Sequence, residues 1–179
     1  MDIYITFDDG PHPQITPWVL EQLENYNAKA TFFCIGKNVV EYPDIYNQII
    51  EKGHIVGNHT HNHLRGRKTK ADSYIADILQ AQKFIDSKLF RPPYGSINSL
   101  QTKKLHQLGF KIILWNIIPG DWDSKVSPEK CLENIILNIV PGSIIVLHDS
   151  VKARENMEYV LPKILEYGQK NKWNFKVLT

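Results

Sequence analysis

Short apolar runs rich in β-forming residues recur along the chain and alternate with helical patterns. Seven runs are candidate strands, at residues 2–7, 29–35, 54–58, 89–91, 110–116, 143–147 and 174–178. Seven strands that alternate with about six helices predict an α/β fold with a parallel sheet or barrel. The chain has 179 residues, so we expect one domain over 1–179. A shortened βα barrel of seven strands is the economical prediction, and a doubly wound sheet is the alternative.

Several helices carry start signals in the sequence. Thr16 followed by proline predicts an N-cap with proline at the first helical position, and Ser127 followed by proline repeats that pattern. The helix after Ser127 has an apolar stripe that ends at a Pro-Gly pair. A second stripe begins near residue 75, with Asp72 or Ser73 as the expected cap.

Composition and charge exclude some classes of function. Apolar residues make up 42% and charged residues 22%, and the net charge is +2. These values are ordinary for a globular protein, so we expect no nucleic-acid partner. No apolar run is long enough to span a bilayer. The first candidate strand begins at about residue 2, so we expect a cytoplasmic location, or the cell envelope or secretion if upstream residues are missing. We also expect a monomer, with Cys34 and Cys131 as buried or half-buried thiols outside any disulfide framework.

Ionisable residues follow five of the candidate strands. They lie at Asp8–Gly10, His59–His63, Arg91–Gly95, Gly120–Trp122 and His148–Asp149. Each segment alone could be a turn, a loop or a helix cap. In a βα barrel, however, the carboxyl ends of all strands meet on one rim, where catalytic residues gather. Their joint occurrence at successive strand ends therefore predicts one active site.

The chemistry that fits these residues is that of a metal hydrolase. Catalytic zinc takes three N or O ligands and keeps one position open, and a carboxylate with two histidines supplies three. His59 and His63 are spaced i, i+4, which would place both rings on one face of a helical turn. One of the two adjacent aspartates can bind the metal while its neighbour acts as general base. His148 can protonate the leaving group, Arg91 can hold the base ionised, and Asp121 can hold His148 protonated.

The motifs ITFDDGP, HTHNH, RPPYG, GDW and IIVLHD occur in this order from Thr6 to Asp149. They resemble the polysaccharide deacetylases of carbohydrate esterase family 4, which include chitooligosaccharide deacetylases. The resemblance implies a distorted (β/α)7 barrel. It also implies a hydrolase that uses one divalent metal ion, with zinc expected, to remove acetyl groups from N-acetylated sugar units. The expected partner is an acetylated glycan, chitin-like or peptidoglycan-like.

The resemblance also implies a role for each matched residue. Carried over by position, the family pattern makes Asp8 the base, Arg91 its partner, His148 the general acid and Asp121 the residue that tunes His148. The other assignments are Asp9, His59 and His63 as metal ligands, the Tyr94 backbone N–H for the oxyanion, and Trp122 and Val146 for the acetyl methyl group.

Two positions depart from the family pattern. Ile118 stands where the fourth motif usually has an aspartate, and Val146 stands where leucine is common. Both departures concern substrate fit. Two other functions stay open: an O-acetyl esterase acting on xylan or another glycan, and a glycan-binding domain without catalysis.

We expect most of the remaining histidines and tryptophans to have no role in the site. We expect His61 to point away from the two ligand histidines, and His54 and His106 to lie at an edge or on the surface. Trp18, Trp115 and Trp173 sit in apolar patterns and are expected in the core. Arg65, Arg67, Lys68 and Lys70 form a basic patch, read either as a solvated loop or as a neighbour of an acidic polymer.

Overall fold

Seven parallel strands form one curled sheet in this computed structural model, which describes residues 1–179. The strands are β1 (Asp2–Asp8), β2 (Ala30–Cys34), β3 (Ile55–Asn58), β4 (Leu89–Phe90), β5 (Lys111–Ile112), β6 (Ile144–His148) and β7 (Asn174–Phe175). Their hydrogen-bonded order is β5-β4-β3-β2-β1-β6, and β7 pairs with the start of β1. All five predicted motifs follow strands of this sheet or the connection after β5.

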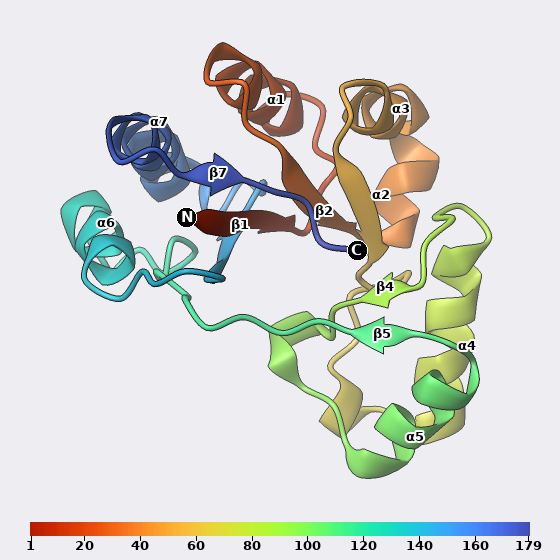
Figure 1. The fold of residues 1–179 in the computed structure, drawn as a ribbon. Helices are drawn as coiled ribbons and strands as arrows, with labels where there is room; N and C mark the ends of the chain where they lie inside the picture. The colour runs from red at the N-terminus through yellow and green to blue at the C-terminus, as the bar shows by residue number, and fades with distance from the viewer.

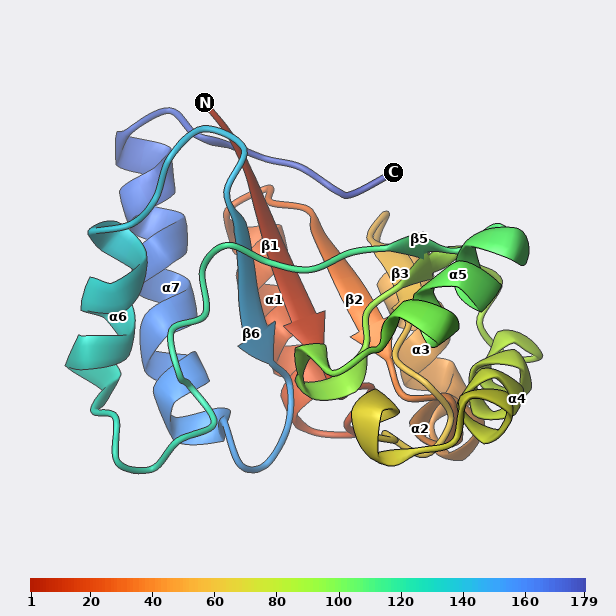
Figure 2. The same ribbon diagram turned by 90° about the horizontal axis from the view of Figure 1, so that it is seen from below.

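The sheet curls into a distorted barrel that closes through a single bridge. After β5 the chain continues as an extended connection that runs back toward α6 (Pro128–Ile136) (Figure 2). On the way, Ile117 forms a parallel bridge with Ile145 of β6. The (β/α)7 prediction is therefore confirmed, and the doubly wound alternative is wrong. The strand expected at 110–116 pairs with β4 only at Lys111–Ile112, because the following residues leave β4 to reach the opposite edge.

Helices surround the strands on the outside of the curl (Figure 1). Besides α6 they are α1 (Ile15–Asn25), α2 (Gly36–Glu41), α3 (Pro43–Glu51), α4 (Ala71–Gln82), α5 (Ser99–Gln107) and α7 (Arg154–Lys170), with short 3₁₀ turns η1 (Gly66–Lys68) and η2 (Pro93–Gly95). None of them combines the length and apolar character that crossing a bilayer requires.

The main core lies between the central strands and the helices packed on them. It comprises 28 buried residues, among them most of the apolar side chains of β1, β2, α1 and α7. Phe7 and Phe32 stack across neighbouring strands with ring centroids 5.0 Å apart. Both cysteines are free and buried, as predicted. Burial on both faces explains why β1 and β2 read as nearly continuous apolar runs.

The helix starts agree with the sequence at one position and differ at two. Ser127 is the N-cap of α6, where its hydroxyl accepts a hydrogen bond from the Lys130 N–H, as predicted. The cap predicted at Thr16 is wrong, because α1 begins at Ile15 and the Thr16 hydroxyl donates to a distant buried carboxylate instead. The cap predicted at Asp72 or Ser73 is also wrong, because α4 begins at Ala71.

His54 is another correction, because it is buried and not at the surface. Its side chain is only 4% exposed. Nδ1 accepts a hydrogen bond from the Ala30 N–H, and the ring packs edge-on against Phe32. Burial lowers the pKa of His54 to about 4, so the neutral ring is favoured. His106 is exposed, as predicted.

Candidate active site

A cleft of about 490 Å³ opens at the carboxyl ends of the strands. Its lining combines most of the predicted site residues with several others: Asp8, Asp9, His59, His63, Arg65, Tyr94, Trp115, Ile118, Trp122, Val146, His148, Ser150 and Lys152. The strands and loops that carry them are β1, β3, β6 and the loops that follow them, η2, and the connection after β5. The predicted residues Arg91 and Asp121 are buried behind this lining. The motifs converge on one rim, as predicted.

Three of these side chains form a candidate metal site. The ligand atoms of Asp9, His59 and His63 all lie within 4.8 Å of one another. Asp9 Oδ1 lies 3.1 Å from His63 Nε2 and 3.7 Å from His59 Nε2. That oxygen is buried and has no aligned hydrogen-bond donor. A buried carboxylate oxygen that faces two imidazole nitrogens fits a bound cation, and the donor set of two nitrogens and one oxygen suits zinc.

The loops that carry these ligands bend through left-handed backbone conformations. Asp9, Thr60 and His63 have φ values of 82°, 64° and 55°. The helical turn considered for residues 59–63 is therefore absent, and a bend brings the two rings to a centroid separation of 5.1 Å. Such conformations cost energy in residues other than glycine, and they gather at functional sites.

The protonation states of the candidate ligands favour cation binding. His59 is buried, and its Nδ1 lies 2.7 Å from the carbonyl oxygen of Arg91. A carbonyl can only accept, so Nδ1 carries the proton and Nε2 presents a lone pair to Asp9. Burial lowers the pKa of His59. Burial opposes ionisation of Asp9, but the contact with His63 and the nearby His59 and His148 outweigh it and lower its pKa to about 2.

Asp8 lies beside this site in a buried ion pair. The Asp8 side chain is 4% exposed and that of Arg91 is fully buried. Arg91 Nη1 donates to Asp8 Oδ1 at 2.8 Å and to the Thr6 hydroxyl at 2.6 Å. The guanidinium also lies 4.1 Å from the ring centroid of Phe33. These contacts fix one oxygen of Asp8, while Oδ2 lies 3.9 Å from His59 Nε2, on the side of the candidate ligands.

His148 and Asp121 form a second pair on the same rim. Asp121 Oδ1 lies 2.9 Å from His148 Nδ1, and Asp121 Oδ2 accepts the backbone N–H of His148 at 2.7 Å. Nδ1 therefore carries a proton, and Nε2 is left for the cleft. Burial alone would lower the pKa of His148, but the hydrogen bond and charge of Asp121 raise it to about 9. The imidazolium form is thus favoured at neutral pH.

The remaining predicted residues also line the cleft. Trp122 lies edge-on to His148 with centroids 5.0 Å apart, and Val146 on β6 is buried. Tyr94 has a φ of 60°, and its ring lies 4.8 Å from that of His63. In its loop, the next two N–H groups, of Gly95 and Ser96, donate to backbone carbonyls.

Sequence reasoning missed several residues of the cleft. Trp115, predicted in the core, is half-buried and lines the cleft. Arg65 lies over the Tyr94 ring at 4.1 Å, so this member of the basic patch contacts the site. Arg65 follows the histidine motif closely in the sequence, and this position could have indicated that it lies at the site. Ser150 and Lys152 also line the cleft, and nothing in their types distinguished them from an ordinary loop.

Asp149 holds the turn that carries the two adjacent aspartates. It is 1% exposed, and its carboxylate accepts the Gly10 N–H at 3.0 Å and the Thr16 hydroxyl. A Cβ at Gly10 would lie 2.1 Å from Asp149 Oδ2, so only glycine fits this contact. Burial raises the pKa of Asp149 to about 7, and the charge of Asp9 adds to the shift. His61, as predicted, is not among the candidate ligands; its ring stacks on Phe84.

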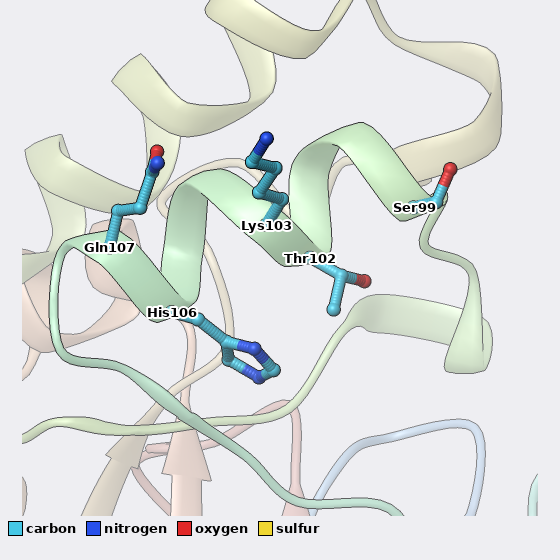
Figure 3. Close-up of a pocket in the computed structure, with 5 residues that line it drawn as sticks. All are labelled: Ser99, Thr102, Lys103, His106 and Gln107. Carbon is cyan, nitrogen blue, oxygen red and sulfur yellow. The ribbon is translucent and has the colours of Figure 1, made fainter.

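A second hollow lies along the outer face of α5 (Figure 3). Its five lining residues, Ser99, Thr102, Lys103, His106 and Gln107, all come from this one helix. Figure 3 shows Thr102 and His106 on one side of the helix and Lys103 and Gln107 on the other. Side chains that point apart cannot converge on a small substrate, so the cleft at the strand ends is the candidate active site.

The fold and this rim together define the class of protein: an α/β barrel hydrolase. The family model for polysaccharide deacetylase matches residues 1–113. A peptidoglycan-N-acetylglucosamine deacetylase of Bacillus cereus is 38% identical over 180 residues, which cover 97% of this chain and 84% of that protein. The chain belongs to the polysaccharide deacetylase family, which confirms the resemblance of the five motifs.

Two further relatives agree with this assignment. A chitooligosaccharide deacetylase of Azorhizobium caulinodans is 39% identical over 154 residues, covering 82% of this chain and 73% of that protein. Among solved structures, the Bc1960 peptidoglycan N-acetylglucosamine deacetylase in complex with 4-naphthalen-1-yl-N-oxidanyl-benzamide superposes with a TM-score of 0.93 at 32% identity. That match covers 99% of this chain and 86% of the other.

Proposed function

We propose that this protein is a metal-dependent deacetylase that hydrolyses the acetamido group of N-acetylglucosamine units in a glycan and releases acetate. One observation supports it above all. The Asp9, His59 and His63 cluster shares a cleft with a buried Asp8–Arg91 pair and the residue His148. Membership of the polysaccharide deacetylase family supports the same reaction.

The metal would be held by Asp9, His59 and His63. Zinc is the expected ion, because two imidazoles and one carboxylate are a common catalytic zinc set. When bound, such an ion supplies Lewis-acid polarisation of the acetyl carbonyl and lowers the pKa of a water molecule. The fixed Nδ1–H of His59 keeps Nε2 free for this role.

Asp8 would act as the general base. Its Oδ1 is held by Arg91, which leaves Oδ2 to accept a proton from the attacking water. Arg91 is itself fixed by the Thr6 hydroxyl and by weaker contacts to the Ile113 and Leu114 carbonyl oxygens. The base is thus oriented before substrate binds.

His148 would act as the general acid. Deacetylation expels an amine, and the leaving nitrogen needs a proton. The imidazolium of His148 is favoured by Asp121, and Nε2 carries the proton that faces the cleft. Acid and base then come from different strands, β6 and β1, which pair side by side with Asp8 in register with His148.

The backbone N–H of Tyr94 would stabilise the oxyanion that develops on the acetyl oxygen. Trp122 and Val146 would enclose the acetyl methyl group. The cleft volume of about 490 Å³ is in the range of roughly 300–1,000 Å³ that is typical of small-molecule sites. Two relatives are named for peptidoglycan N-acetylglucosamine and one for chitooligosaccharides, so we propose a β-linked N-acetylglucosamine polymer as the substrate class.

The test is acetate release in the presence of zinc from three substrates: N-acetylglucosamine oligomers, peptidoglycan and O-acetylated xylan. We expect acetate and free amino groups from at least one of the first two. Acetate from xylan alone would establish the O-acetyl esterase alternative. Glycan binding without acetate from any substrate would establish the non-catalytic alternative and contradict the proposal.

A further inference from the structure

The loop that carries His59 and His63 has little internal support, because its one side-chain hydrogen bond runs from the Leu64 N–H to the Thr60 hydroxyl at 3.2 Å. It contains no helix or strand, and Thr60 and His63 have positive φ. A β-branched residue such as Thr60 strongly disfavours this region of backbone space. Such a bend persists only when surrounding groups hold it in place. The ligand geometry therefore depends on contacts outside the loop.

One support comes from Asn58, at the end of β3. Asn58 Oδ1 accepts the Thr60 N–H at 2.8 Å, and its Nδ2 donates to the Ile78 carbonyl oxygen of α4 at 2.9 Å. Asn58 thus connects the start of the loop to α4. The Gly36 and Lys37 N–H groups of α2 donate to the Thr60 and His61 carbonyl oxygens at 2.9 and 3.2 Å, and the N–H groups that lead into His63 need a second support.

Asp77 of α4 provides that second support. Its Oδ2 accepts the His61 N–H at 2.8 Å and the Asn62 N–H at 3.0 Å, and its Oδ1 accepts the Asn62 side-chain amide at 2.6 Å. Successive backbone N–H groups that converge on one oxygen form an anion-binding nest. Asp77 is 9% exposed, so this carboxylate is mostly shielded from water. Each hydrogen bond to a charged acceptor contributes more than a neutral one.

We propose that Asp77 is a positioning residue for the metal site: its carboxylate holds residues 61 and 62 so that His59 and His63 face Asp9. This inference rests on the proposed function, because it concerns the same ion. Asp77 belongs neither to the candidate ligands nor to the cleft lining. Loss of an outer partner of a metal ligand typically weakens metal binding about 10–100-fold.

Three variants separate positioning from simple stabilisation. In Asp77→Asn the new amide oxygen can still accept the two backbone N–H groups, but its NH₂ faces the NH₂ of Asn62. Adding Asn62→Asp to this variant restores a donor–acceptor pair in the reverse direction. Asp72→Asn is the matched control, because Asp72 lies on the same helix, is exposed and pairs with Lys104 of α5.

The experiment measures zinc affinity of the metal-free proteins by competition with a chromophoric chelator. It also measures their thermal unfolding and the amide hydrogen exchange of His61 and Asn62. For Asp77→Asn we expect about 10-fold weaker zinc binding and faster exchange at both amides. The Asp77→Asn/Asn62→Asp double variant should recover most of the affinity, and Asp72→Asn should match wild type.

Two results would overturn the inference. One is wild-type zinc affinity in Asp77→Asn. The other is a folded double variant that binds zinc no better than the single one. If Asp77→Asn fails to fold, the double variant still tests the inference, because the inference requires the double variant both to fold and to bind zinc. A wild-type protein that binds no zinc would instead refute the proposed function.

Discussion

Replacing Asp8 by asparagine should separate proton transfer from metal binding. The substitution keeps the shape of the side chain and leaves Asp9, His59 and His63 in place. The protein should therefore still bind one zinc ion. The base is lost, and a positioned general base contributes about 10²–10⁴-fold to the rate, so acetate release should fall by that factor.

The same change has a stability cost that follows from burial. The side chains of Asp8 and Arg91 are 4% and 0% exposed. Breaking a buried ion pair by removing one charge costs roughly 3–5 kcal/mol. The new amide oxygen can still accept from Arg91 Nη1, and Arg91 keeps its bond to Thr6, so we expect about 3 kcal/mol. For a chain of this size that lowers Tm by roughly 6–12 °C.

The assay combines zinc content, zinc titration and acetate release for Asp8→Asn and for the control Asp9→Asn. Excess zinc should do nothing for Asp8→Asn. Asp9→Asn should bind zinc more weakly, because a neutral amide is a poorer ligand, and excess zinc should partly restore its rate. If Asp8→Asn loses zinc while Asp9→Asn keeps it, the two roles are exchanged and the reasoning fails.

Three further changes have defined outcomes. Asp121→Asn removes the charge that opposes the effect of burial on His148, so the pKa of this histidine should fall below about 9. The alkaline limb of kcat/KM should then move to lower pH, checked with an NMR titration of the imidazole; an unmoved limb would exclude His148 as the acid. Gly10→Ala places a Cβ against the Asp149 carboxylate, and urea unfolding should show a loss of roughly 1–3 kcal/mol, whereas an unchanged midpoint would contradict the contact. Burial lowers the pKa of His54 from 6.5 to about 4, so its contribution to stability is present above pH 6.5 and lost as the pH falls toward 4. His54→Gln should flatten this acid dependence in urea unfolding, and an equally steep loss of stability would refute it.

The sequence was sufficient to predict the fold and many of the residues that meet on the rim. Parallel strands present all their carboxyl ends on the same side, so motifs that follow β1, β3 and β6 converge whatever the details of the loops. For this reason the sequence alone places Asp9, His59 and His148 on one rim. The end of β5 could not be predicted, because the apolar pattern of this strand continues through the connection that closes the barrel.

Local backbone geometry could not be predicted from spacing. The interval between His59 and His63 is the same in a helical turn and in the observed bend, and the positive φ values of Thr60 and His63 distinguish the two conformations. At Thr16, too, the local sequence does not determine the local structure. Its sequence context is that of a helix cap, but Asp149 competes for its hydroxyl.

Contacts between segments that are distant in the sequence could not be predicted either. Asp77 is an unremarkable acidic residue on a helix until α4 is known to pack behind the histidine loop. Trp115 reads as a core residue because its neighbours are apolar, yet the turn of the connection after β5 brings it into the cleft. Both depend on tertiary packing that no local pattern encodes.

The measurement that tests the central claim most directly is acetate release from an N-acetylglucosamine oligomer by metal-stripped protein during a zinc titration. We expect no acetate without metal, and a rate that rises with added zinc and levels off at one ion per chain. A chelator should abolish the restored rate. Acetate release that is unaffected by the chelator, or none at any zinc concentration on any acetylated glycan, would contradict the account.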